Sequence, residues 1–502
     1  MSEQTATAAG WYFPNPPDLA RRPDLSPTAE ILVLSTNVAD KQTYPSWLHS
    51  ERFVPRRFMR PVMRFADTEA SSGIMLLIAA AIALIWANAP FGESYAEFWE
   101  GTHISIEFGN WLHFDESLQE IVNDGLMAIF FFVVGLEIKR ELVLGELRDP
   151  KAAALPAVAA LGGMVFPALI YVGFVMGTGG EAMAGWGVPM ATDIAFSIGV
   201  VALLGSRVPV GAKLFLLALA IADDIGAITV IAVFYTDDLS LAWLGGALAG
   251  LVVIEAAKRA GVRSAVFYVP MAVATWFFLL ESGVHATLAG VALGLMTPSR
   301  PMFSSDEFDN KARRILDTYP ARATTQTARE HVDYEARQLT AVAHESIAPL
   351  SRLEHRLLPW SSFAIVPIFA LANAGVRFAG VDLVDAVTHP VALGVGVGLV
   401  AGKMFGVSLF TFVAVKLNIG RLPRGTTWQH VWGLALLAGI GFTVALFIAS
   451  LAFDDPTLTD RAKTGIFLGS LTAGLAGYWL LRRSSPAVSI DGADQDRPAD
   501  AL

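Results

Sequence analysis

The chain has 502 residues, of which 54% belong to the apolar types AVILMFWYC and only 16% are charged. Its mean hydropathy is +0.51, and soluble proteins carry about 25% charged residues, so the composition excludes a soluble or disordered chain and favours a polytopic membrane protein. The formal net charge of -10 gives no support to a nucleic-acid partner, and the absence of cysteine excludes a disulfide scaffold, a cysteine-ligated metal site and a thiol nucleophile.

The chain begins with a polar segment, 1–65, that is rich in proline and arginine and lacks the apolar core and cleavage site of a signal peptide. We expect it to be a largely disordered cytoplasmic extension. From there on, stretches of about 20 apolar residues, the length that crosses a bilayer, follow one another. They predict an all-α membrane protein with eight spans within 66–297 and four within 358–482. The twelve predicted transmembrane helices are 70–89, 118–138, 152–177, 185–205, 211–234, 239–257, 264–281, 283–297, 358–376, 388–412, 427–453 and 462–481.

Lysine and arginine gather in every second loop between these spans, while the opposite loops carry mainly glutamate and aspartate. Short cytoplasmic loops carry the positive excess in membrane proteins. Both termini are therefore predicted to be cytoplasmic, in a chain surrounded by lipid in the bacterial inner membrane.

Three segments outside the spans have distinctive sequences. In the first external loop, residues 103–112 alternate around a Gly-Asn pair, which indicates a small β-hairpin that could pair with a second subunit. The charged cytoplasmic insert 298–357 is predicted to be partly helical, at 306–316, and is either a solvated connector or a regulatory or partner-binding element. The acidic tail 483–502 is expected to be disordered.

Two adjacent aspartates, Asp223 and Asp224, lie in the apolar fifth span, where a charge costs about 2.5 to 3.5 kcal/mol. Neighbouring helix residues point about 100° apart, so the two carboxylates are expected to have different partners. Lys403 in span ten is the candidate partner of one of them. A buried pair can serve stability alone, but two acids and one lysine leave a spare carboxylate for proton and cation exchange.

Spans four and eleven are predicted to be interrupted near the middle of the membrane. Span four contains Pro189, Thr192 and Asp193, and span eleven contains Gly-Ile-Gly-Phe-Thr at 439–443. Such residues either serve helix packing or unwind the helix and free carbonyl groups that can bind a cation. An acid such as Asp193 suits the positive N-termini of half-helices and Lys403 the negative C-termini. Spans three to five and ten to twelve form triplets of opposite orientation, as inverted-topology repeats require.

Further charged residues are candidates for lesser roles. Asp124 in span two either lines a passage or is an acid near an external helix end. Glu137, Arg140 and Glu141 close the same span as a solvated helix end or as a charge cluster at a funnel mouth. His285, embedded in the predicted span eight, is either a hydrogen-bonded structural residue or a proton carrier.

These motifs together resemble the NhaA-type sodium/proton antiporters. The resemblance covers the region from about position 66 to 482 without the insert, and rests on six motifs: Gly-Leu-Glu-Ile-Lys-Arg-Glu (135–141), Ala-Thr-Asp (191–193), Ala-Asp-Asp-Ile-Gly-Ala (222–227), Ser-Gly-Val-His-Ala-Thr-Leu-Ala-Gly (282–290), Pro-Ile-Phe-Ala-Leu-Ala-Asn-Ala-Gly (367–375) and Gly-Ile-Gly-Phe-Thr (439–443). It implies twelve spans in which the broken spans four and eleven cross, a fold that is itself a known example of inverted repeats.

By resemblance, Asp224 is the main cation ligand and proton carrier, Asp223 alternates between Lys403 and a proton-linked role, and Thr192 and Asp193 line the site. Sodium would be held by Asp224, Asp223 and Thr192. Asp124 is implied as a secondary contributor.

The resemblance also assigns Glu137, Arg140 and Glu141 to a pH-responsive cluster, and His285 is a further pH-response candidate. The hairpin at 103–112 resembles a homodimer contact. The N-terminal extension, the insert and the acidic tail depart from compact members of the family.

The predicted function is exchange of cytoplasmic sodium or lithium for external protons by alternating access, electrogenic and faster at higher cytoplasmic pH, with no cofactor and no enzymatic activity. The alternative is a sodium-coupled solute symporter with a related broken-helix fold. Two enzyme classes fit less well. An aspartyl protease needs two carboxylates that share a proton across a gap, and a magnesium-dependent lipid enzyme needs more acids and phosphate-binding cations than the spans contain.

Overall fold

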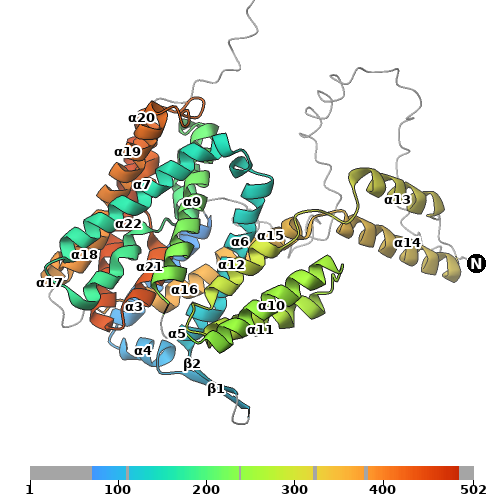
Figure 1. Ribbon diagram of the computed structural model, residues 1–502, viewed down its shortest axis with the longest axis horizontal. Helices are drawn as coiled ribbons and strands as arrows, with labels where there is room; N and C mark the ends of the chain where they lie inside the picture. The colour runs from blue at the N-terminus through green and yellow to red at the C-terminus, as the bar shows by residue number, and fades with distance from the viewer. Residues whose placement is uncertain (1–70, 109–111, 237–238, 320–324, 378–382, 485–502) are drawn as a thin grey trace, which may run out of the picture. The chain divides into compact units, whose positions relative to one another are not determined.

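The computed structural model describes residues 71–108, 112–236, 239–319, 325–377 and 383–484. Most of the regular structure in them is helical (Figure 1). The predicted N-terminal extension, nearly all of the acidic tail and the Gly-Asn pair of the hairpin lie outside these residues.

The first half of the chain contains a hairpin and both regular and irregular helices. In chain order these are α3 (Ser71–Asn88), α4 (Glu93–Trp99), β1 (His103–Phe108), β2 (Leu112–Ser117), α5 (Leu118–Glu120), the π-helical η4 (Ile121–Leu126), α6 (Met127–Val143), the 3-10 turn η5 (Glu146–Arg148), α7 (Pro150–Val175), the 3-10 helix η6 (Gly180–Met190), α8 (Ile194–Leu204), the 3-10 turn η7 (Gly205–Arg207) and α9 (Val210–Phe234). The strands β1 and β2 pair antiparallel with His103 opposite Ser117, so a hairpin lies where one was predicted, and its second strand extends beyond position 112.

In the second half of the chain, all regular elements that the structure describes are helices. Its elements are α10 (Leu241–Arg259), α11 (Ala265–Leu280), α12 (Thr287–Met296), α13 (Ser305–Thr318), α14 (Gln326–Glu345), α15 (Pro349–Trp360), the π-helical η8 (Ser361–Ile365), α16 (Val366–Asn373), α17 (Leu383–Thr388), α18 (Pro390–Val397), the π-helical η9 (Gly398–Gly402), α19 (Lys403–Lys416), α20 (Trp428–Leu437), α21 (Phe442–Ala452) and α22 (Pro456–Arg482).

Within the described residues, 9 continuous helical stretches are long and apolar enough to cross a membrane, and the pair α20 and α21, bent by 47°, raises this to 10. The apolar helices α11 and α12 are shorter, with 16 and 10 residues. At 1.5 Å per residue α12 is about 15 Å long, half the thickness of the hydrocarbon core. The exact number of twelve spans therefore stays a prediction.

The long helices α7 and α22 begin in the same way. Each starts with a proline directly after an aspartate whose side chain caps the helix: Asp149 accepts from the amide of Lys151 at 3.0 Å, and Asp455 from that of Thr457 at 2.8 Å. Proline suits the first helical position because no helical partner awaits its missing amide hydrogen. The Asp-Pro pair therefore fixes where each helix starts.

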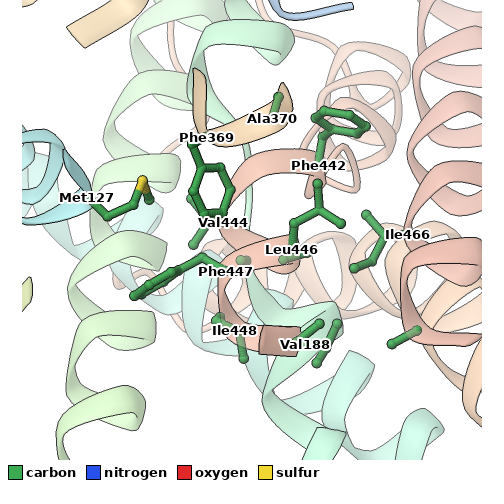
Figure 2. Close-up of a cluster of buried hydrophobic side chains, with 14 of the residues drawn as sticks. Met127, Val188, Phe369, Ala370, Phe442, Val444, Leu446, Phe447, Ile448 and Ile466 are labelled. Carbon is green, nitrogen blue, oxygen red and sulfur yellow. The ribbon is translucent and has the colours of Figure 1, made fainter. Parts of the chain in front are cut away.

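Helix α21 forms the centre of the apolar core. Its first eight residues, Phe442 to Ala449, are all buried, which is typical of a helix enclosed on every side. Figure 2 shows it surrounded by Met127 of α6, Phe369 of α16, Ile466 of α22 and Val188 of η6. The C-terminal half of broken span eleven is therefore held by contacts all around it.

Two helix crossings bring backbones into direct contact through glycine. A Cβ atom on Gly162 of α7 would lie 2.3 Å from the carbonyl oxygen of Gly406 in α19, and one on Gly406 would lie 2.1 Å from that of Gly162. Likewise, a Cβ atom on Gly290 of α12 would lie 2.1 Å from the carbonyl oxygen of Ala128 in the α6 helix. Small residues allow this close approach. The first crossing also brings the side chain of Lys403 against α7.

The insert forms helices of its own. The stretch predicted at 306–316 lies within α13, which starts with a capping box between Ser304 and Glu307. The helix that includes predicted span nine begins at Pro349, nine residues before the predicted start, because its first turns are charged and escape a hydropathy criterion.

Candidate functional site

The two interrupted spans cross at their breaks. Span four is broken between η6 and α8, and span eleven between α20 and α21. The amide of Asp193 donates to the carbonyl of Ile440 at 2.6 Å, and the hydroxyl of Thr192 donates to that of Ala438 at 2.7 Å. The hydroxyl of Ser197 donates to the carbonyl of Leu437 at 2.8 Å. Polar groups of span four thus satisfy the carbonyls that the break in span eleven exposes.

These contacts bear on one of the two interpretations from the sequence. If the break in span eleven unwinds the helix, its carbonyl groups are free to bind a cation. Those of Leu437, Ala438 and Ile440 instead accept hydrogen bonds from span four. A cation at this crossing would depend on carboxylate oxygens, which are the stronger ligands for a hard ion.

Asp193 joins the N-termini of two half-helices. Its side chain caps α8 by accepting from the amide of Phe196 at 3.2 Å. Its other oxygen accepts from the amide of Thr443 at 3.2 Å and from the Thr443 hydroxyl at 2.6 Å, at the start of α21. The partial positive charges of both helix ends stabilise this buried carboxylate. Asp193 therefore lies at the N-termini of two half-helices, the position that suits an acidic side chain.

Lys403 pairs with one of the two adjacent aspartates. Its Nζ lies 2.5 Å from Oδ2 of Asp223 and 3.0 Å from the hydroxyl of Thr192, and the side chains of Lys403 and Asp223 are both 0% exposed. Because Thr192 in turn donates to Ala438, the lysine is linked to the C-terminal end of α20. A pair without access to water is stable only while both partners remain, since either one alone would be an uncompensated charge.

Asp224 is the neighbour of Asp223 on α9, and the ion pair with Lys403 is formed by Asp223. Its side chain is buried, with 7% of the residue exposed, and its Oδ1 has no hydrogen-bond partner among the residues that the structure describes. Oδ1 of Asp223 likewise has no hydrogen-bond partner among the residues that the structure describes. The carboxyl groups of Asp223, Glu137 and Asp193 are near enough to interact electrostatically with Asp224. The site therefore contains a buried carboxylate that a proton or a cation would neutralise.

Asp124 lies away from this crossing, on the π-helical turn η4. Together with Glu116, Glu120 and Trp276 it lines a small cavity of about 30 Å³, and its carbonyl accepts from the indole nitrogen of Trp276 at 2.9 Å. The structure does not bring Asp124 into contact with the aspartates of α9. Its assignment as a secondary contributor rests on the sequence.

The charge cluster at the end of α6 includes a residue that the sequence reasoning missed. Arg140 contacts Glu141 at 3.2 Å and also forms an ion pair with Glu354 of α15. Glu354 had been assigned to the insert because it lies in the charged run that precedes span nine. The buried Glu141 also lines an open pocket of about 680 Å³ that is bounded on another side by Leu214 and Leu217 of α9.

His285 differs from its predicted environment. It was expected within span eight, but the structure places it in the turn before α12, where its carbonyl accepts from the amide of Leu288 at 3.1 Å. The reason is local: Gly283 has a positive φ of 80° and the regular helix begins only at Thr287. Other participants that the sequence reasoning did not list are Ser197 and Thr443, although Thr443 belongs to a motif that it used.

The fold and this crossing define a multi-pass membrane transporter in which two broken helices cross beside the buried carboxylates of Asp193, Asp223 and Asp224. The family model described as Na+/H+ antiporter 1 matches residues 63–481. The chain belongs to this family of NhaA-type sodium/proton antiporters, whose members are transporters rather than enzymes, move sodium ions and protons, and use no cofactor.

Relatives with this name match over most of their length. The chain is 44% identical to the Na(+)/H(+) antiporter NhaA of Janthinobacterium sp. over 449 residues, which cover 88% of this chain and 98% of the relative. It is 46% identical to Na(+)/H(+) antiporter NhaA 2 of Sorangium cellulosum over 430 residues, covering 86% and 91% of the two chains. A solved sodium proton antiporter from Methanocaldococcus jannaschii covers 84% of this chain and 96% of its own, but at 15% identity and a TM-score of 0.39 this likeness carries no weight.

Proposed function

We propose that this chain exchanges cytoplasmic sodium or lithium ions for external protons, with Asp224 as the carboxylate that both ions occupy in turn. The observation that carries the proposal is the contrast between two adjacent buried acids. Asp223 is paired with Lys403, whereas Oδ1 of Asp224 has no hydrogen-bond partner in the described part of the chain.

The mechanism follows from the cost of an unpaired buried charge. Asp224 is stable in a closed site only when it is protonated or bound to a cation. Competition between the two ions, combined with a site that opens to one side at a time, yields exchange. Sodium bound at Asp224 would also be near Asp223 and Thr192, which we propose as its further ligands, while Asp193 keeps the two broken spans in register.

Charge movement follows from the second aspartate. When sodium attracts Asp223, the Asp223–Lys403 pair loosens and Lys403 can release a proton. More than one proton then moves for each sodium ion, so the exchange is electrogenic. Protons also compete directly for Asp224, so activity rises with cytoplasmic pH.

We assign a modulating role to the cytoplasmic end of α6. Glu137, Arg140 and Glu141 are proposed to make transport responsive to cytoplasmic pH, and the cavity beside Glu141 supports access from that side. Asp124 is proposed as a secondary contributor on the external side, and His285 stays a further pH-response candidate.

The arrangement in the bacterial inner membrane is part of the same proposal. We propose cytoplasmic termini, a cytoplasmic extension at 1–65, transmembrane regions at 66–297 and 358–482 and a cytoplasmic insert at 298–357. A tail at 483–502 and a homodimer joined through 103–112 complete the arrangement. The antiparallel strands β1 and β2 support the dimer because a hairpin has edges that a second copy could extend.

The test is sodium-induced collapse of a pH gradient in inside-out vesicles at equal expression of each variant. The wild type should collapse the gradient, Asp224→Asn should not, and Asp309→Asn on the exposed surface of α13 should behave as the wild type. A wild type that fails across neutral to alkaline pH, with sodium and with lithium, would contradict the proposal. Stimulation of sodium flux by an organic solute would then favour a sodium-coupled symporter.

A further inference from the structure

The outer half of span four has an unusual helical form. The segment η6 runs as a 3-10 helix for 11 residues, from Gly180 to Met190, whereas 3-10 helices seldom exceed about four residues because their hydrogen bonds are poorly aligned. Pro189 removes one backbone donor near its end. Something outside the segment must therefore stabilise this form.

A tyrosine hydroxyl is inserted into the backbone of this segment. The Oη of Tyr235 donates to the carbonyl of Ala184 at 2.7 Å and accepts from the amide of Gly187 at 3.1 Å. Ala184 and Gly187 are three residues apart, the pair that a 3-10 hydrogen bond would join. The hydroxyl therefore bridges this pair, as an inserted side chain or water does in a bent helix.

The fit between this hydroxyl and the backbone is close. A Cβ atom at Gly187 would lie 2.6 Å from Oη of Tyr235, so a larger residue at this position would displace the ring. A second buried phenol, Tyr171 of α7, donates to the carbonyl of Ala182 at 2.7 Å. Two tyrosines, one in α7 and one directly after α9, thus donate to carbonyl groups of η6 that are two residues apart.

The position of Tyr235 in the chain links this contact to the ion site. Tyr235 directly follows α9, the helix that carries Asp223 and Asp224. The segment that it binds, η6, ends at Met190, and a single residue separates it from Thr192, which contacts Lys403. One hydroxyl therefore fixes the separation between the carboxylates of span five and the polar break of span four.

We infer that Tyr235, assisted by Tyr171, is a positioning residue that sets the distance between Thr192 and the carboxylates of α9, and through it the apparent affinity for the transported cation. The inference rests on the proposed function. It assigns no contact between either tyrosine and the ion.

The test compares Tyr235→Phe and Tyr171→Phe with the wild type in proteoliposomes that contain the full chain, with sodium as the probe at alkaline pH. Each variant should raise the KM for sodium by about threefold to tenfold, the effect of about one lost hydrogen bond, and leave the maximal rate within about twofold. The matched control is Tyr268→Phe. It removes a hydroxyl that donates to the carbonyl of Val262 at 2.8 Å on an exposed surface. Its KM should not change.

A double-mutant cycle separates positioning from general stability. Gly187→Ala should raise the KM because the added methyl group pushes against the Tyr235 hydroxyl. In combination with Tyr235→Phe that collision is relieved, so the KM of the double variant should be below the product of the two separate effects. Strictly multiplicative effects would overturn the inference.

An unchanged KM in both tyrosine variants, with or without a lower melting temperature, would also overturn it, because the tyrosines would then serve only the fold. A wild type without sodium/proton exchange would instead reject the proposed function. The two failures are therefore distinguishable.

Discussion

The two broken spans differ in what they contribute to the crossing. Span four supplies side chains: Thr192, Asp193 and Ser197 all form hydrogen bonds with span eleven. Span eleven supplies backbone carbonyls, the amide and hydroxyl of Thr443, and helix α21, whose first eight residues are buried. The C-terminal half of span eleven is a regular α-helix, whereas the N-terminal half of span four is a 3-10 helix bound by two tyrosine hydroxyls. The comparison teaches that similar interruptions can present acidic and hydroxyl side chains in one span and mainly backbone groups in the other.

The largest effect is expected from Lys403→Ala. Lys403 contacts both Thr192 of span four and Asp223 of α9, and the substitution removes both contacts. An unpaired buried Asp223 should lower the free energy of unfolding by about 3 to 5 kcal/mol and impair exchange. Thermal unfolding in detergent and vesicle transport measure both. The double variant Asp223→Asn with Lys403→Ala should recover most of the stability, and full stability of the single variant would remove the salt-bridge argument.

Phe447→Ala tests the supporting role of span eleven. Phe447 is fully buried, with its ring 5.4 Å from that of Phe131 and 6.2 Å from that of Phe369. Its truncation should destabilise the protein by about 3 to 5 kcal/mol, while the KM for sodium in the remaining folded protein stays near that of the wild type. A large increase in KM would show that α21 takes a direct part in ion binding and would break the comparison.

Asp193→Asn tests the chemical role of span four. Asparagine has one acceptor oxygen where the carboxylate has two, so it cannot accept from both Phe196 and Thr443. It also loses the charge that favours two helix N-termini, so stability should fall by about 1 to 3 kcal/mol. The cation affinity should weaken more than the stability suggests, since a negative charge leaves the site. Sodium titration of exchange checks this point, and an unchanged apparent affinity would take Asp193 out of the site.

The smallest effect is expected outside both broken spans, at Glu116 at the end of β2. Partial burial and, to a smaller extent, the nearby charge of Glu120 raise the pKa of Glu116 from 4.5 to about 7. A raised carboxyl pKa means that ionisation opposes folding, so its cost develops between about pH 4.5 and 7 and persists above. Glu116→Gln should therefore raise the melting temperature slightly at pH 8 and not at pH 4. Equal differences at both pH values would contradict this assignment.

The sequence allowed much of the fold and part of the site to be predicted. The apolar stretches located the long helices, and glycine, proline and polar residues located both breaks, because these residue types disturb a membrane helix wherever it packs. The angle between neighbouring helix residues predicted that Asp223 and Asp224 would face different surroundings.

Contacts between distant segments could not be derived in the same way. Helical geometry alone does not tell which aspartate meets Lys403, and only the resemblance implied that it is Asp223. No sequence pattern shows that Thr192 lies between Lys403 and Ala438, or that Glu354 reaches Arg140. His285 lies in the turn before α12 and not in its regular helix, because an apolar stretch does not show where a regular helix begins. The inserted hydroxyl of Tyr235 had no local signal, since its partners lie 48 and 51 residues away.

The glycine contacts limit how the molecule can move. At the crossings of α7 with α19 and of α6 with α12, backbone touches backbone without an intervening side chain. At these contacts the helices cannot shift past one another through side-chain rotamer changes, because there is no side chain to rearrange. Each helix pair is therefore expected to move as one rigid unit. The displacement that the proposed alternating access requires then has to occur where longer side chains separate the helices.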